Sequence, residues 1–334
     1  MPNLVILTDL QSPALNTHEM KILCLHPWGA SAEIFEKQMS LIYAMIGESH
    51  EYVFLDGPIS CGPAKENPPN LPGPFYNWYE GLSSSQVRDA HDLVQDVIED
   101  DGPFDGVIGF SQGASLALSI LYHHEICHPD RPPPFRFAIF FCAVLSISPD
   151  PMFNADIIAK YSRYYRQIKH KEEDEKDKTT MEELQRASLL QDNNRSAVTH
   201  KLSRLKNHRA ILLLPGQKAA LVKEILALVR QLVDNSAEHD HAARTQWNTR
   251  GGMEGFPRVY HPLVNMQRIS IPTVHIIGRS DPLRPHSELQ ARLCSKGLTR
   301  VVEFEGVHKV PHRMNDVQAV LKAVEWAMRM AQMR

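Results

Sequence analysis

A serine lies in the pentapeptide Gly109-Phe110-Ser111-Gln112-Gly113, between a strand-like run and a helical pattern. In a nucleophile elbow of the form G-x-S-x-G, a sharp turn between strand and helix exposes the serine hydroxyl, and small neighbours let the two elements approach. The pattern alone also fits a serine in an ordinary glycine-rich turn. Its strand-turn-helix context therefore carries the prediction that Ser111 is a nucleophile.

Two later residues can complete this chemistry. A serine hydroxyl attacks only when a histidine accepts its proton, and a carboxylate must orient that histidine. After an elbow of this type, the acid and then the histidine follow later strands of the sheet. Asp281 follows the apolar run 271–278, and His308 follows the strand pattern that ends at Phe304. We therefore predict a catalytic triad of Ser111, Asp281 and His308.

Other residues fit these roles less well. His312 is close to His308 in the chain, but it lies beyond Pro311 at the edge of the last helical pattern. Asp56, Asp105 and Asp150 adjoin earlier strands and lack the required late position. Asp281 alone would be an ordinary turn residue, and it gains its role only from the order of the three residues.

An acyl-transfer intermediate also needs two N–H donors aimed at its oxyanion. Gln112 directly follows the serine, where the first N–H groups of a helix have no partner inside it. The loop 26–29 after the first strand can supply the second donor. Pro27 has no N–H, so we predict Trp28 as this donor, with Gly29 as the alternative.

The substrate pocket is predicted from the loops around these groups. Residues 59–78 are rich in proline and glycine and end in a cluster of aromatic residues. We expect an ordered loop that brings aromatic rings near the site, with a surface loop and a local cluster as the alternative. The predicted pocket residues are His26, Asp56, Tyr76 and Trp78.

Apolar runs that alternate with helical patterns predict the scaffold that positions these residues. Continuous apolar strands separated by helices are typical of a parallel sheet covered on both faces. With the order of the triad, this pattern predicts an α/β-hydrolase fold. Strands are expected at 21–25, 52–56, around 107–108, 137–146, 271–278 and 299–304, and helices at 31–45, 83–100, 114–126, 287–294 and 315–330.

The pattern also predicts how the chain is divided. Residues 1–19 are expected to form an N-terminal arm, and residues 20–148 with 262–334 the hydrolase core. The stretch 149–261 is too long for a structureless loop, so we expect a large inserted lid, mainly helical and partly mobile. It contains a charge run at 169–178, an amphipathic helical pattern at 221–233 and a polar tract at 235–255. The charge run is typical of a solvated face or of disorder.

The composition argues against several other classes of protein. A net charge of -3 over 334 residues gives no electrostatic reason to expect nucleic acid or an anionic membrane surface as partner. Five cysteines without C-x-x-C spacing are typical of reduced thiols in a cytoplasmic protein. No apolar run reaches the roughly 18 residues of a membrane span. We therefore predict a cytoplasmic protein without a membrane segment.

Histidines outside the predicted triad do not indicate a metal. His123, His124 and His128 form one group, and His239 with His241 forms another. Neither group has a carboxylate or thiolate partner at ligand spacing on an ordered element. We predict that these are surface histidines and that the enzyme uses no metal and no cofactor.

Five stretches of the chain together resemble the fungal FSH family of serine hydrolases. They are residues 104–114, 25–29, 53–58, 271–281 and 306–311. This family is related to the human ovarian-cancer-associated serine hydrolase and to fungal polyketide-releasing thioesterases. The resemblance covers about residues 20–150 and 262–330, and it implies action on esters or thioesters in fungal secondary metabolism. Two features depart from the family: His26 is followed by Pro27 instead of glycine, and the insertion between Ser148 and His261 is longer than the usual lid.

We therefore predict a serine hydrolase that cleaves a small-molecule or polyketide-type ester or thioester through an acyl-enzyme, with the acyl group free or bound to a carrier protein. The alternative is a fold repurposed for cyclisation or another carbon-skeleton step, with His308 or Asp281 as acid or base. The long insertion and the His-Pro loop motivate that alternative. A non-catalytic binding module would call for a broken triad, which the sequence does not have. The oligomeric state is not predicted.

Overall fold

The computed structural model describes residues 19–47, 49–64, 67–68, 70–155, 215–236 and 257–334. Nearly all of the predicted N-terminal arm lies outside these ranges. The charge run 169–178 and most of the polar tract 235–255 also lie outside them. None of the helices in the described ranges is long and apolar enough to cross a membrane.

Six parallel strands form the central sheet in the order β2-β1-β5-β6-β7-β8. Strands β5, β6 and β7 are buried over their whole length, which is typical of a parallel sheet with helices on both faces. This arrangement confirms the predicted fold class. The strands are β1 (Lys21–Leu25), β2 (Glu51–Leu55), β5 (Gly106–Phe110), β6 (Phe137–Phe141), β7 (Thr273–Gly278) and β8 (Thr299–Phe304).

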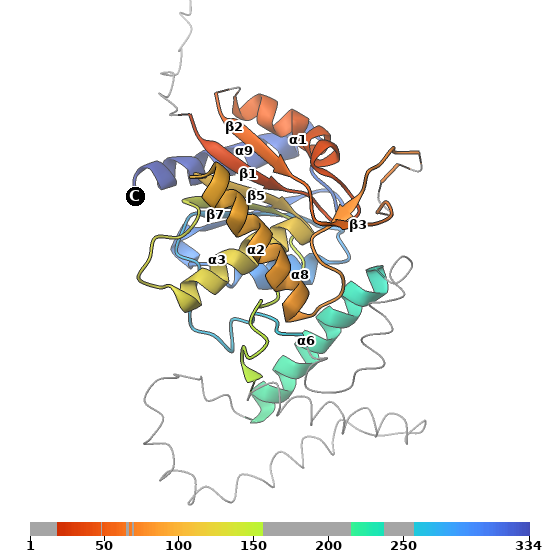
Figure 1. Cartoon of the computed structure of the whole chain (residues 1–334), viewed down its shortest axis with the longest axis vertical. Helices are drawn as coiled ribbons and strands as arrows, with labels where there is room; N and C mark the ends of the chain where they lie inside the picture. Colours follow the sequence, from red (N-terminus) through yellow and green to blue (C-terminus); the bar gives the residue numbers. More distant parts are fainter. Residues whose placement is uncertain (1–18, 48, 65–66, 69, 156–214, 237–256) are drawn as a thin grey trace, which may run out of the picture.

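Helices cover both faces of the sheet (Figure 1). Helices α1 (Ala32–Ile46) and α9 (Met314–Gln332) pack on one face, and α2 (Ser84–Asp101), α3 (Gln112–Cys127) and α8 (Arg284–Ala291) pack on the other. Successive residues of a strand point to opposite faces, so β1 serves two cores. Ile22 and Cys24 pack with α1 and α9, while Leu23 and Leu25 pack with α2 and α3.

The order of the strands determines where a site can form. The chain leaves β1 toward β2 on one side and later enters β5 on the other side of β1. In sheets of this kind, ligands bind at the carboxyl ends of the strands where the direction of the connections reverses. The loop after β1 and the turn after β5 flank this point, and they carry the predicted oxyanion loop and Ser111.

The structure corrects three predicted elements. The strand expected at 137–146 ends at Phe141, because Cys142 has a φ of 44° and breaks the extended chain. The helix expected at 287–294 is α8, Arg284–Ala291, with a proline in its first turn, where a helix tolerates it. The stretch 59–78 contains a small antiparallel pair, β3 (Ile59–Ser60) and β4 (Tyr76–Asn77).

One helix of the predicted lid is described. Helix α6 (Pro215–Ser236) spans the helical pattern expected at 221–233, and its apolar residues pack against Leu145, Val259 and Leu289. Val259 pairs with Ile147, and Tyr260 is fully buried in the core. The last residues of the stretch 149–261 therefore pack with the hydrolase core.

Candidate active site

Ser111 occupies a strained position between β5 and α3. Its φ of 52° and ψ of -112° fall outside the regions that L-residues commonly adopt, and such strain persists only where the surrounding structure imposes it. The Ser111 N–H donates to the Phe141 carbonyl at 2.9 Å, and the Ser111 carbonyl accepts from the Ser115 N–H at 3.0 Å. These bonds hold the elbow to β6 and to the first turn of α3.

Two glycines permit this geometry. A Cβ atom at Gly109 would lie 2.5 Å from the Ala114 Cα, and one at Gly113 would lie 2.2 Å from the Leu25 carbonyl oxygen. Both distances are too short for a real side chain. The first turn of α3 therefore packs directly on the end of β1, which brings the loop after β1 beside Ser111.

The three predicted triad residues form a continuous hydrogen-bonded chain. The Ser111 Oγ lies 2.8 Å from the His308 Nε2, and the His308 Nδ1 lies 2.8 Å from the Asp281 Oδ2. The other carboxylate oxygen of Asp281 accepts the Leu283 N–H at 2.8 Å. This arrangement fits a histidine that accepts the serine proton while a carboxylate orients it.

The environment of Asp281 keeps its carboxyl group charged. The Asp281 side chain is fully buried and the His308 side chain is 14% exposed. Burial alone would raise the pKa of Asp281, but the hydrogen bond from His308, its positive charge when protonated, and the Leu283 N–H together lower this pKa below its usual value. The charged carboxylate accepts a hydrogen bond from the Nδ1–H of His308. The Nε2 lone pair of His308 therefore faces Ser111.

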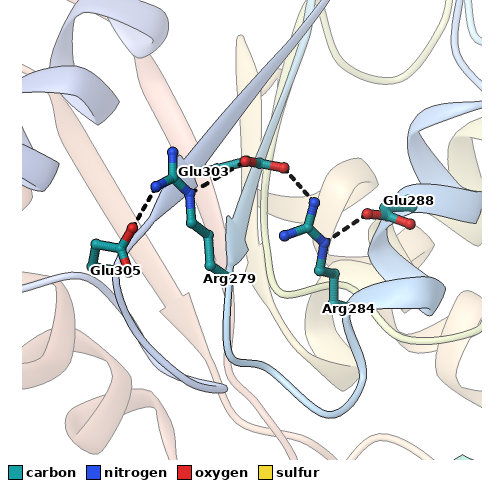
Figure 2. A network of polar contacts seen from close by, with 5 residues as sticks. All are labelled: Arg279, Arg284, Glu288, Glu303 and Glu305. Atoms are coloured by element: carbon teal, nitrogen blue, oxygen red, sulfur yellow. Dashed lines mark hydrogen bonds and ion pairs between the residues drawn. The ribbon is translucent and has the colours of Figure 1, made fainter.

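A chain of ion pairs joins the loops that carry Asp281 and His308 (Figure 2). The Arg279 guanidinium, two residues before Asp281, bridges Glu303 on β8 and Glu305 directly after β8. Arg284 bridges Glu303 and Glu288, with distances of 2.6 and 2.7 Å. These side chains are partly or largely exposed, so each pair adds little stability. They connect the turn with Asp281 to β8 and to the residue that follows it.

Backbone contacts join the same two loops more firmly. The Arg279 N–H donates to the Phe304 carbonyl at 3.0 Å, and the Ser280 N–H donates to the Gly306 carbonyl at 2.9 Å. A Cβ atom at Gly278 would lie 2.5 Å from the Val307 carbonyl oxygen. The turn with Asp281 is thus packed against the loop with His308.

The predicted oxyanion donors lie on the two chain segments that meet at the elbow. Gln112 begins α3, where its N–H has no acceptor within the helix. The alternative donor Gly29 contributes its N–H to the Tyr76 carbonyl at 3.1 Å and to the Asn77 Oδ1 at 3.2 Å. Trp28 is half-buried in the same turn. The role of Trp28 stays a prediction.

His26 and Trp78, predicted as pocket residues, brace this loop from within. The His26 Nε2 accepts the Gly57 N–H at 2.9 Å, and its Nδ1 contacts the Pro27 carbonyl at 2.7 Å. The Trp78 Nε1–H donates to the His26 carbonyl at 2.8 Å, and the two rings stack with centroids 4.9 Å apart. Burial lowers the pKa of His26. Both side chains are almost fully buried, so their described contacts are with the protein itself.

Asp56 and Tyr76, also predicted as pocket residues, contact the start of α1. The exposed Asp56 accepts the Ala32 N–H at 2.6 Å through its Oδ1 and so caps this helix. Tyr76 is half-buried, and its backbone N–H donates to the Ala30 carbonyl at 2.7 Å. Contact of any of the four residues with substrate stays a prediction.

The side chain of Gln112 has a role that sequence reasoning missed. Its Oε1 accepts the Trp78 N–H at 3.0 Å, and its Nε2 donates to the Tyr79 carbonyl at 2.7 Å. Gln112 thus joins the elbow to the aromatic segment that follows β4. The only sign of this role in the sequence is that an amide side chain directly follows Ser111.

Among the described residues, one group has the composition of a metal site. It consists of Cys142, Asp281 and His308, whose ligand atoms all lie within 4.8 Å of one another. The hydrogen bonds of the triad account for two of its members. His123 and His124 are half-buried and His128 is exposed, and His123 lies 3.6 Å from the Cys127 sulfur on α3. His239 and His241 lie outside the described residues. A separate cavity of about 310 Å³ between α6 and α8 is lined by none of the triad residues.

The chain is similar to several known proteins. The esterase alnB of Emericella nidulans is 33% identical over 325 residues, which cover 93% of this chain and 98% of that protein. An Aspergillus terreus thioesterase, named for dihydromonacolin L and the lovastatin nonaketide synthase, is 30% identical over 151 residues, or 39% of this chain and 58% of that protein. The solved structure of a Paleococcus ferrophilus monoacylglycerol lipase covers 93% of this chain and 94% of its own, at 15% identity and a TM-score of 0.43.

The model of the family described as Serine hydrolase (FSH1) matches residues 16–184 and 188–320. The matched ranges include the elbow, the turn with Asp281 and the loop with His308, and they confirm the resemblance inferred from the sequence. The chain therefore belongs to the FSH1 family of serine hydrolases.

Proposed function

We propose that this serine hydrolase cleaves an ester or thioester of a polyketide-type acyl group through an acyl-enzyme on Ser111. The observation that supports the proposal is the continuous chain from the Ser111 Oγ through His308 to Asp281, with both distances at 2.8 Å. A buried, charged carboxylate behind the imidazole equips His308 to accept and return one proton.

The proposed reaction has two halves. His308 accepts the Ser111 proton while Oγ attacks the acyl carbonyl, and the N–H groups of Gln112 and Trp28 stabilise the oxyanion. His308 then protonates the departing alcohol or thiol. A water molecule, deprotonated by His308, attacks the acyl-enzyme in the second half and releases the acid and Ser111.

The substrate class is proposed from the relatives. One relative over nearly the full chain is named an esterase, and a more distant one is named a thioesterase for dihydromonacolin L and the lovastatin nonaketide synthase. Both leaving groups suit a triad that needs no metal. We propose a small-molecule acyl ester or a thioester held by a carrier protein, within fungal secondary metabolism. We also propose the cytoplasmic setting expected from the sequence.

The test is to trap the acyl-enzyme. The protein is mixed with p-nitrophenyl esters and with acyl N-acetylcysteamine thioesters of increasing chain length, and intact-mass spectrometry follows the adduct. We expect a burst of leaving group and an adduct on the peptide that contains Ser111. Ser111→Ala should lose both, and the exposed Ser40→Ala should keep both. Turnover by Ser111→Ala at the wild-type rate would contradict the proposal.

A further inference from the structure

Cys142 is a buried thiol at the end of β6, and no role in the triad described above accounts for it. Its side chain is fully buried, and its φ of 44° is a conformation that residues other than glycine rarely adopt. The Cys142 N–H donates to the Ile276 carbonyl of β7 at 2.8 Å. The strand that leads to Asp281 thus fixes the position of Cys142.

The Cys142 thiol reaches both loops of the triad. Its Sγ lies 3.8 Å from the carbonyl oxygen of Lys309, the residue after His308. The same sulfur lies within 4.8 Å of a carboxylate oxygen of Asp281 and of a ring nitrogen of His308. Of the five cysteines, all of which are described, this is the one whose sulfur lies within 4.8 Å of both the acid and the histidine.

We propose that Cys142 is a positioning residue of the triad, whose S–H donates to the Asp281 carboxylate and keeps it aimed at His308. A thiol carries one proton, and the charged carboxylate is a stronger acceptor than the Lys309 carbonyl. Asp281 would then receive three donors: the His308 ring N–H, the Leu283 N–H and the Cys142 S–H. A fully buried carboxylate calls for such complete pairing.

The surroundings keep this thiol protonated. Burial, and next the negative charge of Asp281, raise the pKa of Cys142 far above its usual value. A thiolate beside Asp281 would repel the carboxylate, so Cys142 acts only as a donor. The proposal rests on the triad assigned above, and it concerns how the acid is held, whatever ester or thioester is the substrate.

The test compares Cys142→Ala with Cys142→Ser by the rate of fluorophosphonate labelling of Ser111 and by kcat and KM on a p-nitrophenyl ester, from pH 5 to 9. Cys142→Ala should lower kcat about tenfold, equivalent to about 1.4 kcal/mol in the barrier, with little change in KM. A carboxylate that loses a donor attracts the His308 proton more strongly. The acid limb of the labelling rate, which is its decline at low pH, should therefore move to higher pH in Cys142→Ala. Cys142→Ser should bring this limb back toward its wild-type position.

Cys24→Ala is the matched control. Cys24 is an equally buried thiol in the same core cluster, and its sulfur donates to the Ile22 carbonyl of its own strand at 3.9 Å. The Cys24→Ala variant should have a lower melting temperature and an unchanged acid limb of the labelling rate. A Cys142→Ala protein that is folded and has wild-type kcat and acid limb would overturn the proposal, and so would an equal shift in Cys24→Ala. If Cys142→Ala does not fold, Cys142→Ser alone tests the proposal. An acid limb of Cys142→Ser that is displaced as far as expected for Cys142→Ala would then overturn the proposal. Labelling needs no turnover, so an unsuitable ester would not imitate either result.

Discussion

Asp281 and His308 differ in their exposure to solvent, and the proposed mechanism gives them different roles. Asp281 is sealed from solvent, while part of His308 reaches the surface beside Ser111. In the proposed mechanism, the buried carboxylate fixes the tautomer of the imidazole, and the exposed edge of the imidazole exchanges protons with the reacting groups. The chemistry therefore depends on the negative charge of Asp281 more than on its size.

Asp281→Asn tests this dependence on charge. The amide keeps the shape but can donate to the His308 Nδ1, which favours the wrong tautomer. We expect kcat to fall about a thousandfold or more, as when the orienting carboxylate is removed from serine-protease triads, with a small change in KM. Steady-state kinetics on a p-nitrophenyl ester measure the loss. The exposed Asp130→Asn should match the wild type, and an active Asp281→Asn would show that another group orients His308.

The sequence predicts the three triad residues because their order along the chain, each after a strand, indicates that they lie at the same edge of the sheet. Ser111, Asp281 and His308 each follow a recognisable strand, and parallel strands gather their carboxyl ends at one edge. Cys142 could be recognised only as a buried thiol, because its contacts with Asp281 and Lys309 depend on three strands that are distant in sequence. The roles of His26 and Gln112 in bracing the loops were hidden for the same reason.

At the scale of elements, α3 holds the segment that follows β6 through a row of serines. The Ser115 and Ser119 hydroxyls, one turn apart, donate to the Val144 and Ile147 carbonyls at 2.8 and 2.6 Å. The Ser146 hydroxyl donates back to the Ser115 carbonyl at 2.9 Å. These bonds explain why residues beyond Phe141 are buried without being strand. An apolar run alone does not distinguish the two cases, so the expected strand was too long.

Ser119→Ala measures the strength of this attachment. The change leaves the Ile147 carbonyl without its donor and removes the partner of the His91 Nε2, which lies 2.8 Å from the Ser119 Oγ. Buried groups without partners cost about 1 to 3 kcal/mol, so we expect the free energy of unfolding in urea to fall by about that amount. Ser40→Ala removes a similar bond, from a helical serine to the Lys37 carbonyl, at the surface. An equally small effect of both changes would contradict the argument.

For the molecule as a whole, the parallel sheet could be predicted from the sequence, whereas the packing of the inserted segment could not. Apolar strands that alternate with helical patterns restrict the topology to a parallel sheet with few possible orders. Helix α6 shows an apolar face in its sequence, but nothing in that face specifies that it packs against Leu145, Val259 and Leu289. Such long-range packing depends on shape complementarity, which periodicity does not record.

Buried histidines make the whole fold sensitive to acid. Burial lowers the pKa of His91 and His275 to about 3, and that of His261 and His286 to about 4. In the unfolded chain these groups have a pKa near 6.5. Between pH 6.5 and these lower values, the unfolded state binds more protons than the native state. Stability is therefore complete above pH 6.5 and declines as the pH falls, by up to about 1.4 kcal/mol per pH unit for each histidine.

Urea unfolding at several values from pH 7.5 to 5 tests this prediction. We expect the free energy of unfolding to fall steeply below pH 6.5, well above the range where carboxylates titrate. His275→Gln should reduce that slope by about one proton, since it removes one buried group that must charge on unfolding. The exposed His312→Gln should leave the slope unchanged. A free energy that stays constant from pH 7 to 5 would contradict the prediction, because it would show that these histidines bind protons equally in the native and unfolded states.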